Sequence, residues 1–182
     1  MFIKISKLEG VLKKAYKGAG IRIERSGSRL IVGTAYMYIE ADVETASKDF
    51  KAAVVRYTGD LPKDGESYTI NEDQSQINIA GTCDQKLFER DTLQGKEFEE
   101  TLLTYNGDMV LQAPMDGQVV VVPMKEWQVY DPNAIDDGED DPDNSWYLQE
   151  NQLINRNGEM ILAFGFKPET DEMKELQKAR LV

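Results

Sequence analysis

Residues 101–111 read Thr101-Leu102-Leu103-Thr104-Tyr105-Asn106-Gly107-Asp108-Met109-Val110-Leu111, two apolar runs joined by an Asn-Gly pair. Asn-Gly readily takes the two positive φ angles of a type I′ turn, whose twist matches that of an antiparallel hairpin. The same dipeptide recurs at Asn157-Gly158, between the apolar stretches 153–154 and 160–164. These two segments predict hairpins and therefore an antiparallel sheet.

Other segments add strands to this sheet. Residues 21–25 alternate apolar and charged side chains, Ser26-Gly27-Ser28 offers a turn, and residues 30–32 are apolar, which predicts a third hairpin. Further strands are expected at 36–41, at 119–122, and in a hairpin that pairs 67–70 with 76–80.

Three segments have helical spacing. Ser6 is a candidate cap for a helix with apolar Leu8, Val11, Leu12, Ala15 and Tyr16, which Gly18 or Gly20 would end. A second helix is expected after Thr45 or Ser47 and ends at Gly59, although the pair Val54-Val55 also allows a strand in this segment. A third begins near Thr170, with apolar Met173, Leu176 and Leu181. The sequence thus predicts a single α+β domain over residues 1–182, a twisted antiparallel sheet built from hairpins with helices near both chain ends.

The composition narrows the chemistry. The 182 residues contain no histidine and a single cysteine, Cys83, so histidine triads, histidine metal sites and thiol zinc sites are excluded within the chain. We expect no cofactor and no metal, and we expect Cys83 to be a small packing residue. No apolar run reaches the ~20 residues of a membrane span, and the first residues lack a secretion signal, so we expect a cytoplasmic protein without membrane contact.

Charge is unevenly distributed. Residues 1–58 hold eleven Lys and Arg against six Asp and Glu, a net charge of +5. Because the whole chain has a net charge of −12, residues 59–182 carry −17. Lys7, Lys13, Lys14 and Lys17 share the polar side of the first helix. A solvated face is the ordinary interpretation of such a stripe, and contact with nucleic-acid phosphates, helped by Arg22, Arg25 and Arg29, is the alternative.

The most acidic segment is 131–144, with seven carboxylates and no basic residue. An EF-hand alignment on Gly138 would place Ile135 at the third position and Asn144 at the twelfth, where a bidentate glutamate is needed. A mobile, solvated loop is the favoured interpretation; an irregular calcium loop and a mimic of nucleic-acid phosphates stay open.

Four aromatic residues, Trp127, Tyr130, Trp146 and Tyr147, bracket this acidic segment. Aromatic side chains near a polar loop are enriched at protein interfaces, and they also contribute heavily to cores. Core anchoring is the ordinary interpretation, and this region is the preferred site for contact with a protein partner.

These observations favour a non-catalytic protein that binds another macromolecule, with a protein as the expected partner. The rival hypothesis is a hydrolase or transferase that uses clustered carboxylates, with or without a divalent cation. No phosphate-binding loop, dinucleotide fingerprint or nucleophile elbow occurs in the chain to support it.

Residues 1 to about 80 carry a family resemblance. The order of amphipathic helix, hairpin and a strand running from Gly33-Thr34-Ala35 into Tyr36-Met37-Tyr38-Ile39-Glu40 resembles one module of a bacterial DNA sliding clamp. Clamp modules usually show an Ala-Thr-Asp-like step where this chain has Gly-Thr-Ala, and a whole clamp subunit has three modules. The resemblance implies a clamp-like module whose basic helix faces DNA in a ring.

Overall fold

A computed structural model describes residues 3–73, 95–133, 145–149, 151–157 and 160–178. Within these ranges the chain forms four helices, which are α1 (Ile5–Tyr16), α2 (Lys48–Thr58), α3 (Met124–Trp127) and α4 (Asp171–Gln177). The strands are β1 (Ile21–Ser26), β2 (Arg29–Gly33), β3 (Met37–Asp42), β4 (Ser67–Ile70), β5 (Lys96–Tyr105), β6 (Asp108–Gln112), β7 (Val119–Val122), β8 (Trp146–Gln149), β9 (Gln152–Asn157) and β10 (Met160–Gly165).

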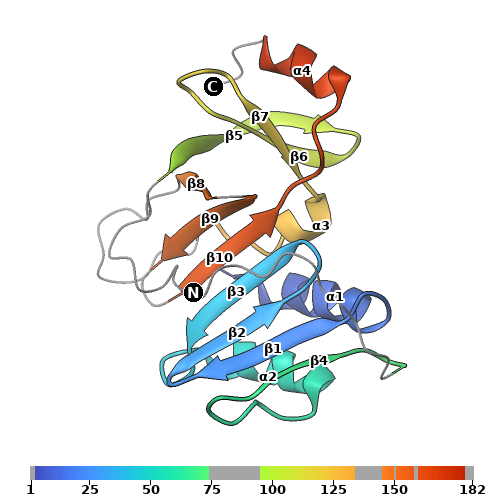
Figure 1. The fold of residues 1–182 in the computed structure, drawn as a ribbon, viewed down its shortest axis with the longest axis vertical. Helices are drawn as coiled ribbons and strands as arrows, with labels where there is room; N and C mark the ends of the chain where they lie inside the picture. The colour runs from blue at the N-terminus through green and yellow to red at the C-terminus, as the bar shows by residue number, and fades with distance from the viewer. Residues whose placement is uncertain (1–2, 74–94, 134–144, 150, 158–159, 179–182) are drawn as a thin grey trace.

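All described strands belong to one open antiparallel sheet in the order β4-β1-β2-β3-β10-β9-β8-β5-β6-β7. The predicted α+β class, with an antiparallel sheet and helices near both chain ends, is therefore confirmed. The pairing of β3 with β10 joins the two halves of the chain, with Met37 opposite Phe164 and Ala41 opposite Met160. Figure 1 shows this junction, where cyan β3 runs beside red-orange β10.

The predicted hairpins are confirmed where the structure describes them. β1 pairs with β2, and β5 pairs with β6 across Asn106 and Gly107, whose φ angles of 51° and 82° are both positive. β9 pairs with β10, with Asn157 opposite Met160. The expected partner of β4 at 76–80 lies outside the described residues, as do Cys83, 134–144 and Leu181, and β4 pairs with β1.

The helix boundaries follow most of the predicted signals. Ser47 Oγ accepts a hydrogen bond from Phe50 N at 3.1 Å to begin α2, and Thr170 Oγ1 accepts one from Met173 N at 3.3 Å to begin α4. Val54-Val55 is helical, so the alternative strand is wrong. Ser6 lies inside α1 and does not cap it, because the helix begins at Ile5 and Lys4 occupies the N-cap position.

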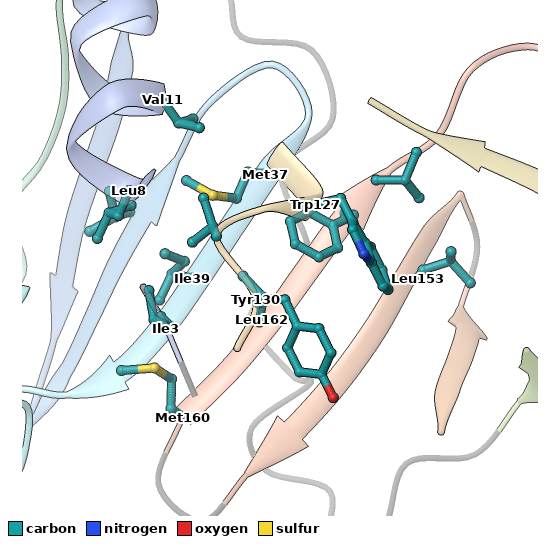
Figure 2. Packing of buried hydrophobic residues seen from close by; sticks show 14 of the residues in the cluster. Ile3, Leu8, Val11, Met37, Ile39, Trp127, Tyr130, Leu153, Met160 and Leu162 are labelled. Atoms are coloured by element: carbon teal, nitrogen blue, oxygen red, sulfur yellow. The ribbon is translucent and has the colours of Figure 1, made fainter. Parts of the chain in front are cut away.

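The main core lies between the sheet and α1 and α2. Alternate residues of neighbouring strands face these helices, so that Ile23, Val32, Ile39 and Leu162 form a continuous row across β1, β2, β3 and β10. The row belongs to the same buried cluster as Leu8 and Leu12 of α1 and Phe50 of α2. Figure 2 shows Leu8 and Val11 approaching Met37 and Ile39.

An aromatic group fills the core where the second half of the chain meets the first. Trp146 is fully buried, with ring centroids 4.9 Å from Trp127, 5.1 Å from Tyr130 and 5.2 Å from Phe164. Tilted and edge-on ring pairs at these separations stabilise a core beyond their area burial. The packing makes this cluster a main contributor to stability.

We expect Trp146→Ala to lower the free energy of unfolding by about 3 to 5 kcal/mol, because it removes a fully buried tryptophan side chain and leaves a cavity. Urea denaturation checks this. Leu102→Ala is the matched control, since Leu102 is fully exposed and its loss is expected to change stability by less than about 0.5 kcal/mol. Equal effects of the two substitutions would contradict the core role of Trp146.

The opposite face of the sheet holds a buried carboxyl group at Glu40 of β3, which is 2% exposed. Burial raises the pKa of Glu40 above its ordinary value of 4.5. The Tyr38 hydroxyl, which donates to Glu40 Oε2 at 3.1 Å, and the charges of Arg29 and Arg156 oppose the shift without cancelling it. Ionised Glu40 therefore costs the folded state stability at neutral pH.

We expect Glu40→Gln to stabilise the protein at neutral pH, because glutamine keeps an acceptor for Tyr38 and removes the buried charge. A raised folded-state pKa means that the carboxyl group favours folding most below pH 4.5 and loses that contribution as pH rises through the folded pKa. The advantage of Glu40→Gln should therefore shrink as the pH falls towards 4.5. Urea denaturation of both proteins between neutral pH and pH 4.5 checks this prediction. A difference in the free energy of unfolding that grew as the pH fell would refute it.

Candidate nucleic-acid interface

α1 has an apolar inward side and a basic outward side. Leu8, Val11 and Leu12 are buried against the sheet, and the helical period turns the residues between them to solvent. Lys7, Lys13, Lys14 and Lys17 are all exposed on that side. The structure therefore places the four predicted phosphate-contact residues on one solvent-facing surface.

α2 extends this surface. It packs beside α1, with the ring centroids of Tyr16 and Tyr57 5.9 Å apart and Arg56 Nη1 2.7 Å from Glu9 Oε1. Residues 5–17 and α2 together, here called the basic layer, carry seven basic side chains and two acidic ones. A net charge of +5 on two adjacent helices contrasts with −12 for the whole chain.

The lysines of the basic layer fall into two groups. Among the described residues, no hydrogen bond or ion pair holds the side chain of Lys13, Lys17 or Lys48. Lys7 Nζ donates to Gln128 Oε1 at 3.2 Å, Lys51 Nζ donates to Val43 O at 3.0 Å, and Lys14 Nζ lies 3.9 Å from Glu126 Oε1. The first group is thus available to a ligand, whereas the second is already in contact with the chain.

Gln128 and Glu126 belong to residues 126–131, here called the seam segment, which lies along α1. Lys4 N donates to Val129 O at 2.8 Å, Ile3 bridges to Tyr130, and Lys4 Nζ lies 3.6 Å from Asp131 Oδ1. Three lysines near the N-terminus, Lys4, Lys7 and Lys14, therefore each meet a polar side chain of this segment. The seam segment ties the basic layer to the second half of the chain.

Aromatic side chains hold the seam segment in place. Trp127 and Tyr130 are buried, with ring centroids 5.6 Å apart, and Figure 2 shows both beside β10. Together with buried Val129 they anchor the backbone, while Gln128 and Asp131 remain accessible. The fold thus brings two of the predicted partner-contact residues close to the predicted phosphate-contact lysines.

Burial changes what the aromatic residues offer to a partner. Trp127, Tyr130 and Trp146 are at most 6% exposed and belong to the core, which was the ordinary interpretation of the sequence. Tyr147 is half-buried. Direct contact with a protein partner through these four residues stays a prediction. Tyr147 retains more accessible surface than the other three.

A second charged group lies where α3 meets β6. Asp108 pairs with Lys167 and accepts a hydrogen bond from Met124 N at 2.9 Å. Burial tends to raise the pKa of Asp108, but the bonds from Lys167 and Met124 outweigh it and hold the pKa below its ordinary value of 3.8. The same bond raises the pKa of Lys167. This ion pair is formed at neutral pH and fixes the start of α3.

Sequence reasoning missed Glu126 and Gln128 because it did not predict α3, and it placed Asp131 only in the acidic segment 131–144. The signal was present, since Pro123 precedes the helix and buried Trp127 and Tyr130 are three residues apart. A helix of four residues is too short to show a periodic apolar pattern. Its contact with α1 is a long-range feature of the fold.

In the ranges 3–73, 95–133, 145–149, 151–157 and 160–178, no three His, Cys, Asp or Glu side chains are grouped so that they could hold a metal ion. No helix within the same ranges is both long and apolar enough to span a membrane.

Comparison with known proteins does not place this chain in a family. No protein-family model matches the chain, and no curated protein matches it. Among solved structures, one similar chain is the beta chain of DNA polymerase III from Streptococcus pneumoniae, with 12% sequence identity and a TM-score of 0.34. The alignment covers 91% of this chain and 63% of that chain, so this chain spans less than two thirds of that protein's length. A likeness at this level does not establish a shared fold.

Proposed function

We propose that this protein is a non-catalytic binding protein whose basic layer contacts the phosphate backbone of a nucleic acid. The observation that carries the proposal is the concentration of seven basic side chains on two adjacent helices of a strongly acidic chain. Lysine and arginine contacts supply most of the sequence-independent affinity for nucleic acids. An acidic molecule that keeps one basic surface directs a polyanion to that surface.

The state of the individual lysines supports the proposal. Lys13 and Lys17, one helical turn apart, carry charges that no described residue neutralises, and Lys48 adds a third on α2. Buried Leu12 and Phe50 fix the helices beneath them, so these side chains project from rigid elements. Such an arrangement suits contact with phosphates of any sequence, because phosphate contacts position a protein on a nucleic acid and carry no sequence information.

We expect Lys13→Gln/Lys17→Gln to weaken binding to a short DNA duplex to the same degree whatever its sequence. Each lost phosphate contact should lower the slope of log affinity against log salt by about 1, so the double variant should lose about two. Fluorescence anisotropy of a labelled duplex at several salt concentrations measures both quantities.

The control is Lys174→Gln/Lys178→Gln, in α4 and at its C-terminal cap. It removes the same two charges from lysines that already pair with Asp171 and Glu175, so it corrects for the change in net charge. If both double variants reduced the slope equally, or if the wild type failed to bind at low salt, the proposal would be wrong.

A protein partner, which the sequence favours, is the second candidate, and β5 supplies the observation for it. Between the pairs Glu100–Leu111 and Thr104–Met109, three residues of β5 lie opposite Val110 alone. Thr101 Oγ1 donates to Val110 O at 2.8 Å and accepts from Leu103 N at 3.1 Å, which holds the bulge. Leu102 and Leu103 are left exposed there, and adjacent exposed leucines favour contact with protein.

The expected cytoplasmic location and the single-domain organisation stay predictions. So do the carboxylate-based enzyme and the clamp-like module, for which the described side chains supply no further support. The basic layer is the surface from which a test of function can begin.

A further inference from the structure

We propose that the seam segment competes with a nucleic acid for the lysines of α1, so that Glu126 and Gln128 lower the affinity of the basic layer. The inference rests on the proposed function and adds a means of regulating that same site. It concerns Lys7 and Lys14, because Lys13 and Lys17 have no partner among the described residues.

The acceptors of the seam segment are held in place before any ligand arrives. Trp127, Val129 and Tyr130 are buried in the core and alternate with the polar positions that meet α1. Lys7 Nζ is 3.2 Å from Gln128 Oε1, and Lys14 Nζ is 3.9 Å from Glu126 Oε1. A phosphate that binds either ammonium must therefore share it with an acceptor or displace that acceptor.

Glu126 is the stronger competitor because it carries a buried charge. Its side chain is 6% exposed, whereas that of Lys14 is 63% exposed. Among the described residues, Glu126 Oε2 is buried without a hydrogen-bond partner, so this oxygen lacks the compensation that buried charges normally receive. Lys14 is the cation closest to it in the described structure, and a low-dielectric setting strengthens their attraction.

The competition has a limited size. Lys14 is largely exposed, and exposed or half-exposed ion pairs are worth a fivefold change in an equilibrium constant at most, roughly. Gln128 is neutral, so its hold on Lys7 is weaker. The seam segment therefore tunes the affinity and does not block the surface.

The coupling is reciprocal. If the seam contacts oppose nucleic-acid binding, a bound nucleic acid must weaken the seam contacts by the same factor. The seam segment connects α1 with α3 and with the aromatic group around Trp146. Occupation of the basic layer is thus linked to how firmly the two halves of the chain are held together at this point.

The test compares Glu126→Gln, Gln128→Ala and Asp171→Asn with the wild type in the duplex anisotropy assay. Glu126→Gln and Asp171→Asn each remove one negative charge, and Asp171, on α4, is 97% exposed. We expect Glu126→Gln to tighten duplex binding about threefold to fivefold and Asp171→Asn to change it much less. Gln128→Ala should tighten binding by a smaller factor with no change in net charge, and it keeps the inference testable if Glu126→Gln fails to fold.

A second measurement needs no nucleic acid. Amine-labelling rates, resolved residue by residue by mass spectrometry, should rank Lys13 and Lys17 above Lys14 in the wild type. Glu126→Gln should raise the rate at Lys14 alone. Unequal rates that Glu126→Gln leaves unchanged would show that Glu126 does not hold Lys14.

The outcomes separate the two proposals. If the wild type binds no duplex, the proposed function fails, and the competition fails with it. If the wild type binds but Glu126→Gln changes affinity no more than Asp171→Asn and Gln128→Ala has no effect, the competition alone is overturned. Tighter binding by both seam variants, with faster labelling of Lys14 in Glu126→Gln, supports it.

Discussion

The structure depends on the antiparallel pairing of β3 with β10. This pairing unites strands from the two halves of the chain in one sheet and aligns Ile39 with Leu162 in the row that α1 covers. It also sets the distance between α1 and the seam segment, because α1 packs on the first half while Trp127 and Tyr130 pack on the second. The lysines of α1 and the acceptors at Glu126 and Gln128 come from the two halves of the chain that this pairing joins.

The electrostatic pattern follows from the same arrangement. Most of the negative charge lies after residue 58, yet the fold places one piece of that half, the seam segment, directly against the basic layer. Opposite charges meet there at 3.6 to 3.9 Å, at the junction of the two halves. Away from the junction, Lys13 and Lys17 pair with no residue in the part of the chain that the structure describes and can meet an external anion. The contacts that hold the seam segment and the proposed contacts with an anion thus use different lysines of the N-terminal region.

Local patterns were sufficient for much of the fold. Asn106-Gly107 predicted its hairpin because the dipeptide alone favours the positive φ angles observed there. Ser47 and Thr170 predicted helix starts because a cap acts within one turn. Signals of longer range failed: α3, which is too short to show a helical period, was not predicted, and neither was β8. The bulge that exposes Leu102 depends on Val110 of the neighbouring strand.

The sequence by itself determined that the chain lacks histidine chemistry, that α1 has one apolar and one basic side, and that hairpins build the sheet, because each of these depends on residue type and short spacing. Only the tertiary structure decided that Trp127, Tyr130 and Trp146 belong to the core and that Lys7 and Lys14 meet the seam segment while Lys13 and Lys17 do not. Burial and pairing depend on residues more than a hundred positions away in the chain, and no local pattern encodes which distant surfaces come together.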